Sequence, residues 1–221
     1  GFYNQKEQHL MQKPAELKKQ IDSVKKMIGM DKIKLSENFL SKKNKLVRID
    51  LNGIAQGYSV DVVADFFESK GIKSYVIELG GEIRAKGPKP DQSAIKIGIE
   101  GPPENEFEEA KIKHIVSFTE GAITTSGSYR KFIAYQDKNY GHIINPKTGY
   151  PIHSEMISVT VFAKRAIDAD GYDNALMLMP VEKAIQFVEH KKDLEAYIIY
   201  KKADGKIADT LSTGFKKLII N

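Results

Sequence analysis

The chain has 221 residues, of which 41% are hydrophobic, and it contains no cysteine and no tryptophan. This length suits one large domain or two small ones, and it is sufficient to bury a core without disulfide or zinc cross-links. Because cysteine is absent, thiol nucleophiles, cysteine-ligated zinc and iron–sulfur clusters are excluded.

The formal net charge of +5 lies in the N-terminal segment. Residues 1–50 hold 12 basic and 6 acidic side chains, whereas residues 51–221 hold 22 and 23. A lysine-rich amphipathic helix in that segment either presents a solvated face or touches a membrane surface or phosphates. The neutral body, with its scattered tyrosines, argues against a nucleic-acid partner. No apolar run approaches the roughly 18 residues of a membrane span, so we expect no transmembrane segment within these residues.

Apolar spacing and the positions of Gly, Pro and Asn predict the elements of the first half. Proline at position 14 opens a helix, and Gly71 ends another. The predicted elements are a helix over 14–29, a strand over 46–51, a helix over 54–70, strands over 74–79, 82–86 and 95–99, and a loop over 102–109.

In the second half, strands arrive in clusters and helices are grouped. The predicted elements are strands over 113–119, 130–135 and 157–163, an ordered loop over 140–151, helices over 168–179 and 181–190 with a break at Pro180, and strands over 194–200 and 215–220. Clustered strands favour an α+β fold, with a largely antiparallel sheet flanked by helices, over a doubly wound parallel sheet.

The segment Asp50-Leu-Asn-Gly-Ile-Ala-Gln-Gly57 runs from a predicted strand through a turn into a helix. Free N–H groups at the start of a helix suit an anion, and a carbonyl in the turn can face a cation. The segment matches neither the Walker pattern nor the full dinucleotide fingerprint, and an ordinary strand-to-helix turn is the more common explanation of such a segment.

His142 is the histidine that lies inside the predicted loop, in Gly141-His-Ile-Ile-Asn-Pro-Lys-Thr-Gly149. Imidazole titrates near neutrality, so a fixed histidine can take the proton of an attacking hydroxyl. The alternative is a hydrogen-bonded structural histidine. The hydroxyls of Ala122-Ile-Thr-Thr-Ser-Gly127 either bind phosphate or serve a turn.

Asp170, Asp173 and Asn174 are spaced i, i+3 and i+4 on a predicted helix and therefore share one face. Oxygen donors of this kind suit Mg²⁺ or Ca²⁺, and two carboxylates favour a divalent ion. The alternative is an acidic helix N-terminus that complements the helix dipole.

Taken together and in this order, these segments resemble the FAD:protein FMN transferases, the ApbE family. The resemblance includes Gly1-Phe2, Met30-Asp-Lys32 and the longer motifs 50–61, 78–87, 122–129, 142–149, 158–161 and 170–178. It implies an ApbE-like core related to the T-fold and a single flavin transferase domain over 1–221. It also implies that these residues form the C-terminal two thirds of a longer protein, whose N-terminal region carries a lipoprotein signal.

The resemblance implies an enzyme that binds FAD and Mg²⁺, cleaves the pyrophosphate and attaches FMN to a threonine of a partner flavoprotein in a membrane redox complex. It implies a periplasmic or membrane-anchored location. His142 matches the general base, and Asp50, Gln56 and Ile144 match positions that contact the flavin nucleotide. The implied metal ligands are the Gly53 carbonyl, Asp170, Asp173 and Asn174.

Two departures from the family pattern bear on the site. Many members have Lys at the position of Gln56, and many have Thr at the position of Asn174, although Asn keeps an oxygen donor. Two other readings therefore stand beside the transferase: Mg²⁺-dependent hydrolysis of FAD to FMN and AMP, and a non-catalytic flavin-binding or interaction module.

Overall fold

The computed structural model describes residues 13–102, 111–127, 132–135, 138–141, 144–151 and 154–220. The chain divides into two compact units. One is formed by residues 1–50 and 131–153, and the other by residues 51–130 and 154–221. The single flavin transferase domain expected over 1–221 stays a prediction.

The described part of the first unit contains a helix and two antiparallel strand pairs. Helix α1 (Pro14–Lys25) begins at the predicted proline, which lacks an N–H at a position where helices need none. A short 3₁₀ helix (Met30–Lys32) follows. The strand pairs are β1 (Ile33–Ser36) with β2 (Phe39–Lys42), and β8 (Phe132–Tyr135) with β9 (Lys138–Gly141).

The strand predicted over 46–51 is wrong, because residues 47–50 have no regular secondary structure. Val47 is buried and its carbonyl accepts a hydrogen bond from Lys42 Nζ at 2.8 Å, whereas Ile49 is exposed. The alternation of apolar residues there does not reflect a sheet. The strands of this region are β1 and β2 instead, and every residue of β2 is exposed, so no hydrophobic pattern marks it.

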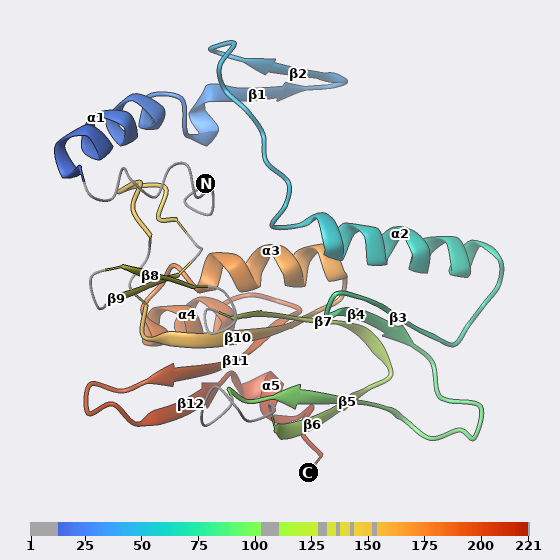
Figure 1. Ribbon diagram of the computed structural model, residues 1–221. Coiled ribbons are helices and arrows are strands. Elements are labelled where there is room, and N and C mark those ends of the chain that lie inside the picture. Colours follow the sequence, from blue (N-terminus) through green and yellow to red (C-terminus); the bar gives the residue numbers. More distant parts are fainter. Residues whose placement is uncertain are drawn as a thin grey trace. The chain divides into compact units, whose positions relative to one another are not determined.

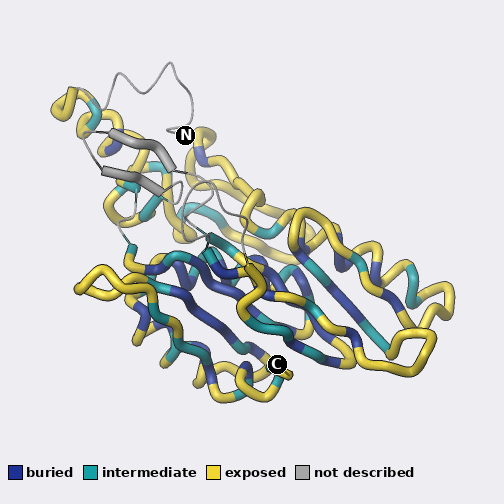
Figure 2. Tube along the Cα trace, turned by 60° about the horizontal axis from the view of Figure 1, so that its bottom comes forward, coloured by how far each residue is buried: buried dark blue, intermediate teal, exposed yellow. Residues whose placement is uncertain are grey.

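The second unit is built on a six-stranded sheet with the order β12-β11-β10-β7-β4-β3, in which every pairing is antiparallel (Figure 1). The strands are β3 (Tyr75–Leu79), β4 (Glu82–Lys86), β7 (Glu120–Gly127), β10 (Met156–Ala163), β11 (Leu194–Lys201) and β12 (Ile207–Leu211). The inner strands β10 and β11 are almost wholly buried, and dark blue runs through the middle of the sheet in Figure 2.

Three helices cover one face of this sheet (Figure 1). Helix α2 (Ala55–Ser69) packs on β3 and β4, α3 (Ala166–Leu176) packs on β7 and β10, and α4 (Val181–Glu189) packs on β11. Pro180 precedes α4 at the predicted break. An antiparallel sheet flanked by helices is the α+β architecture that the sequence predicts.

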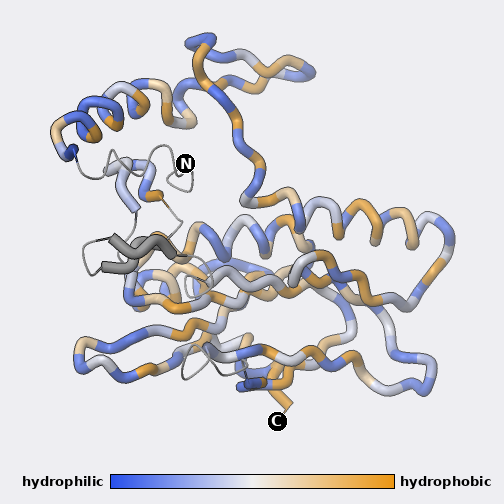
Figure 3. The backbone as a smooth tube through the Cα atoms, viewed as in Figure 1, coloured by the Kyte–Doolittle hydropathy of each residue, from blue (hydrophilic) through white to orange (hydrophobic). Residues whose placement is uncertain are grey.

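Helix α2 lies where the sequence predicts it, but the face that it buries differs from its most apolar face. The apolar positions along it stand out in Figure 3. Tyr58, Val62 and Phe66 are nevertheless 57%, 46% and 55% exposed. The buried positions are Gly57, Val60, Asp61 and Ala64. Two small residues, one valine and one carboxylate therefore form the contact with the sheet and with α3.

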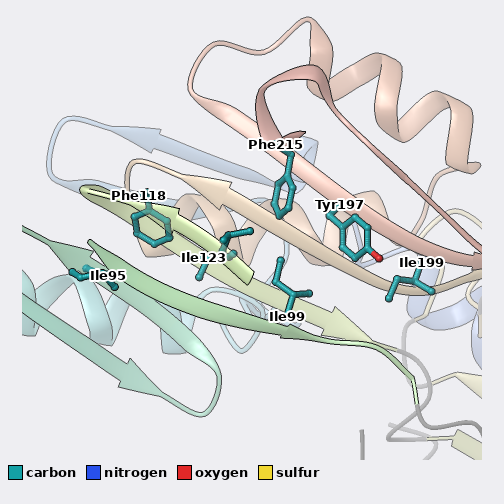
Figure 4. Close-up of a cluster of buried hydrophobic side chains, with 9 residues drawn as sticks. Ile95, Ile99, Phe118, Ile123, Tyr197, Ile199 and Phe215 are labelled. Carbon is teal, nitrogen blue, oxygen red and sulfur yellow. The ribbon is translucent and has the colours of Figure 1, made fainter. Parts of the chain in front are cut away.

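The opposite face of the sheet holds a hydrophobic core, shown in Figure 4. Strands β5 (Ile95–Glu100) and β6 (Ile112–Phe118) pair antiparallel, and they pack there together with α5 (Thr213–Lys216). The buried members of this core are Ala85, Ile95, Ile99, Val116, Phe118, Ile123, Tyr197, Ile199 and Phe215. Each fully buried large apolar side chain stabilises the fold by about 1.5–3 kcal/mol.

The C-terminal strand predicted over 215–220 is wrong. The segment begins inside α5, and Ile219 then forms a single antiparallel bridge with Val116, so the segment borders β6 rather than closing the large sheet. Strand β12 takes the edge position instead. Five strands were not predicted at all: β1, β2, β7, β9 and β12.

Candidate active site

Helix α3 carries the acidic residues singled out from the sequence, and it places two of them in the protein interior. Asp170 and Asp173 are buried, and Asn174 is half-buried. The backbone N–H of Gly57, in the first turns of α2, donates to Asp170 Oδ2 at 2.9 Å. The hydroxyl of Thr124, on β7, donates to Asp173 Oδ2 at 2.7 Å. Each carboxylate is therefore fixed by an element other than its own helix.

The second oxygen of Asp173 has no such support. Among the described residues, Asp173 Oδ1 and Glu82 Oε2 are the buried side-chain oxygens without a hydrogen-bond partner. A buried, unsatisfied carboxylate oxygen is costly, because its hydration is lost and nothing replaces it. A cation placed at this oxygen would supply the missing interaction.

The three carboxyl groups of this region have raised pKa values. Burial raises the pKa of Asp170, and the Gly57 amide opposes the change. Burial raises the pKa of Asp173 well above its usual range, and the charges of Asp170 and Glu82 add to the effect. Burial, together with the charges of Asp170 and Glu78, raises the pKa of Glu82 to about 7. These groups disfavour one another as anions, so a positive charge among them would stabilise the charged forms.

Gly53 and Asn174 lie close together. A Cβ at Gly53 would stand 3.9 Å from Asn174 Nδ2, which places the turn before α2 beside α3. Asn174 Nδ2 donates to the Asp170 carbonyl at 3.1 Å, and its Oδ1 accepts from Ser126 at 3.3 Å. The four residues expected as metal ligands thus come from two adjacent parts of the second unit.

The donor set suits a hard divalent cation. Two carboxylates, an amide oxygen and a nearby backbone carbonyl are ligands that Mg²⁺ accepts, and Mg²⁺ keeps waters or substrate oxygens in its other positions. Within the described ranges, no three His, Asp or Glu side chains come together as a metal-binding group. The expected site contains only two carboxylates, so the absence of a group of three does not test it. The role of these ligands stays a prediction, which the unpartnered oxygen of Asp173 supports.

Gln56 lies at the start of α2, exposed, with its Nε2 3.5 Å from the Leu79 carbonyl. A Cβ at Gly80 would stand 2.2 Å from the same nitrogen. The glycine turn between β3 and β4 is therefore needed for Gln56 to lie against it. Gln56 is close to the acidic cluster, since the same Cβ would stand 3.5 Å from Glu82 Oε2.

Across that turn, a cavity of about 400 Å³ opens on the face of the sheet opposite α3. Its lining includes Glu78, Gly80 and Ile83 from β3, β4 and their turn, and Thr125 and Thr160 from β7 and β10. The hydroxyls of Thr125 and Thr160 lie 2.9 Å apart. The volume is in the range of small-molecule pockets, and the lining mixes isoleucine side chains with carboxylates and hydroxyls.

Two predicted nucleotide contacts belong to the first unit. Asp50 is exposed and lies outside regular structure. Ile144 is half-buried and forms an isolated antiparallel bridge with Pro151. His142 lies outside the described residues, so its role as general base stays a prediction.

Thr124, Ser126 and Glu82 are the site residues that the sequence reasoning did not assign. The sequence predicts that the hydroxyls of 122–127 bind phosphate or serve a turn, and the structure places them on strand β7 (Glu120–Gly127), so the turn is wrong and phosphate binding stays a prediction. Its alternation sends Thr124 toward α3 and Thr125 toward the cavity. Glu82 follows the Gly80-Gly81 turn, and only its place in the 78–87 motif marked it.

No described helix is long and apolar enough to cross a bilayer.

A model of the ApbE family matches residues 1–198. The FAD:protein FMN transferase of Vibrio cholerae is 35% identical over 200 residues, covering 90% of this chain and 58% of the relative. The one from Haemophilus influenzae is 36% identical over 195 residues, covering 86% and 55%.

Solved structures of ApbE flavin transferases also resemble this chain. The flavin transferase ApbE from Vibrio cholerae superposes with a TM-score of 0.79 at 34% identity, covering 90% of this chain and 62% of that one. The apo form of the Pseudomonas stutzeri flavinyl transferase ApbE gives 0.76 at 31% identity, covering 89% and 59%. The chain therefore belongs to the ApbE family. It spans less than two thirds of the length of these relatives.

Proposed function

We propose that this chain moves the FMN moiety of FAD onto a threonine hydroxyl of a partner flavoprotein in a Mg²⁺-dependent reaction. The observation that carries the proposal is the pair of buried carboxylates on α3, of which Asp173 has one oxygen without a partner. Such a pair destabilises the cation-free fold, and it is suited to a divalent cation beside a phosphate.

Asp170, Asp173, Asn174 and the Gly53 carbonyl would hold Mg²⁺, which when bound neutralises negative charge that develops on the pyrophosphate. The chain fixes these donors in advance. The Gly57 N–H orients Asp170, and the Thr124 hydroxyl orients Asp173. Donors that are already in place need no rearrangement during the reaction.

In the reaction, the threonine oxygen forms a bond to the phosphorus of the FMN phosphate. The bond from that phosphorus to the bridging oxygen breaks, and AMP leaves. His142 takes the proton of the threonine hydroxyl. Asp50, Gln56 and Ile144 would contact the nucleotide, and Gln56 supplies an uncharged amide there.

We further propose that the acceptor belongs to a membrane redox complex, and that the protein works in the periplasm or at the membrane through an N-terminal lipoprotein anchor. Membership of the ApbE family supports both statements. Fractionation of cells that produce the protein from its own gene, followed by detection of flavin-labelled proteins in the membrane fraction, tests them. Recovery of the protein in the cytoplasm alone would contradict the location.

The transfer is tested by incubating the chain with FAD, Mg²⁺ and a threonine-bearing flavoprotein acceptor, with the Vibrio cholerae relative in parallel. Mass spectrometry is expected to find FMN on the acceptor. AMP released without acceptor labelling would instead indicate hydrolysis of FAD, and quenched flavin fluorescence without turnover would indicate a non-catalytic module. Either result with a working relative contradicts transfer by this chain.

His142→Ala is expected to lower the transfer rate by about 10²–10⁴-fold, the usual contribution of a general base. The matched control is His190→Ala, because His190 is exposed at the end of α4, where its Nδ1 lies 2.7 Å from the Gln186 carbonyl. The control is expected to transfer normally. Undiminished transfer by the His142 variant would remove this residue from its role.

A further inference from the structure

Asp61 is a fully buried carboxylate in the middle of α2. Arg84 Nη1, on β4, donates to its Oδ1 at 2.7 Å, and Arg165 Nε donates to its Oδ2 at 3.3 Å. Two backbone amides complete its shell. Those of Ala166 and Ile167 donate at 3.1 and 3.0 Å.

The two amides are the first of α3. A helix leaves its first N–H groups without partners, and a side chain at the N-cap position usually accepts from them. The N-cap residue of α3 is Arg165, whose side chain makes no capping hydrogen bond. Asp61 therefore acts as the cap from a different helix, and its negative charge lies at the positive end of the helix dipole.

The same face of α2 also holds a ligand candidate. Gly57 precedes Asp61 by one helical turn, and its N–H is the donor to Asp170 Oδ2. A Cβ at Gly57 would stand 2.3 Å from the Ala166 carbonyl oxygen, so the two helices touch backbone to backbone. One turn of α2 thus fixes the start of α3 through Asp61 and orients Asp170 through Gly57.

We propose that Asp61 is a positioning residue for the cation site of α3. Its hydrogen bonds with the Ala166 and Ile167 amides fix the rotation of α3 about its axis and the position of α3 along α2. This placement brings Asp170 to the Gly57 amide. The inference rests on the proposed function for the identity of the site, whereas the geometry of the cap stands by itself.

Asp65 offers a matched control one turn further along α2. Arg84 Nη1 donates to it at 3.2 Å and Arg165 Nη2 at 2.8 Å, so Asp65 shares both arginine partners of Asp61. Its side chain is half-exposed. No amide of α3 is among its hydrogen-bond partners within the described residues. Asp65→Asn therefore weakens ion pairs to the same two arginines without touching the cap.

The test compares Asp61→Asn with Asp65→Asn in the full chain, using Mn²⁺ titration followed by electron paramagnetic resonance and hydrogen exchange at the Gly57 amide. Asp61→Asn is expected to weaken Mn²⁺ binding at least tenfold and to speed Gly57 exchange at least tenfold. Asp65→Asn is expected to change both by less than twofold. Equal effects of the two variants, or no effect of Asp61→Asn, would overturn the proposal.

A second variant approaches the cap from the other side. Ala166→Pro removes one donor to Asp61 at the first helical position, after an extended Arg165 that tolerates a following proline. It is expected to speed Gly57 exchange in the same direction, and unchanged exchange would contradict the positioning role. If the unaltered chain binds no Mn²⁺, the proposed metal site fails, and Gly57 exchange in these variants still decides the role of Asp61.

Discussion

Replacing Gly57 with alanine tests whether the contact between α2 and α3 sets the candidate site. An alanine Cβ would stand 2.3 Å from the Ala166 carbonyl oxygen, 2.7 Å from its carbonyl carbon and 2.8 Å from Asp170 Cβ. Two of these atoms are backbone, so no side-chain rotation relieves the contact. The helices must separate, and the Gly57 N–H to Asp170 Oδ2 bond of 2.9 Å must lengthen.

Overpacking of this kind costs about 3 kcal/mol, the upper end of its usual range, because the obstacle is backbone. Alanine gains about 1 kcal/mol over glycine inside a helix, which leaves a loss of about 2 kcal/mol. For a chain of this size, such a loss lowers the Tm by about 4–8 °C. Thermal unfolding followed by circular dichroism measures it.

Gly171→Ala is the matched control in α3. Its added Cβ would meet only the Cγ2 of Ile54 at 3.2 Å, a side-chain tip that can move. The Tm of this variant is expected to stay level or to rise with the gain in helix propensity. A Gly57→Ala protein as stable as the Gly171→Ala protein would refute the reasoning about backbone contact.

Two further predictions concern buried charge. Because the pKa of Glu82 rises from its ordinary 4.5 to about 7 in the folded protein, the cation-free fold loses stability as pH rises through this range and stays weakened above it. Glu82→Gln is expected to remove that loss, so urea unfolding in EDTA should show the variant gaining on the unaltered protein at pH 8 but not at pH 4; equal curves at pH 8 would contradict this. Arg84→Leu leaves Asp61 without its closest cation and is expected to lower the free energy of unfolding by about 3–5 kcal/mol. Lys86→Leu, which removes only partly exposed ion pairs, should change it by less than about 1 kcal/mol, and similar losses for both variants would argue against a special role of the buried pair.

The elements that the sequence predicted well are those whose pattern is local. Helices α2 and α3 have helical spacing, and Gly71 and Pro180 mark an end and a break that one chain segment suffices to define. The i, i+3, i+4 spacing of Asp170, Asp173 and Asn174 likewise follows from helix geometry alone. Their shared face was therefore predictable, and so was the chemistry of their oxygen donors.

The features that escaped prediction depend on partners distant in the chain. The first half of strand β7, residues 121–124, is buried on both faces, so it shows no alternation of polar and apolar residues. In the sequence, Asp61 cannot be distinguished from a solvent-exposed acid, because its partners, Arg84 and the first amides of α3, are distant in the chain. The buried face of α2 differs from its most apolar face for the same reason, because close contact with α3 favours small residues over large apolar ones.

The unpartnered oxygen of Asp173 affects which substitutions evolution would accept at this position. Its carboxylate weakens the cation-free fold, so asparagine or leucine at this position would be tolerated, or even favoured, wherever stability alone were under selection. A copy of the gene that no longer needed a cation would be free to lose this aspartate early. Continued selection for cation binding would preserve Asp173, Asp170 and the Gly57 amide that orients Asp170.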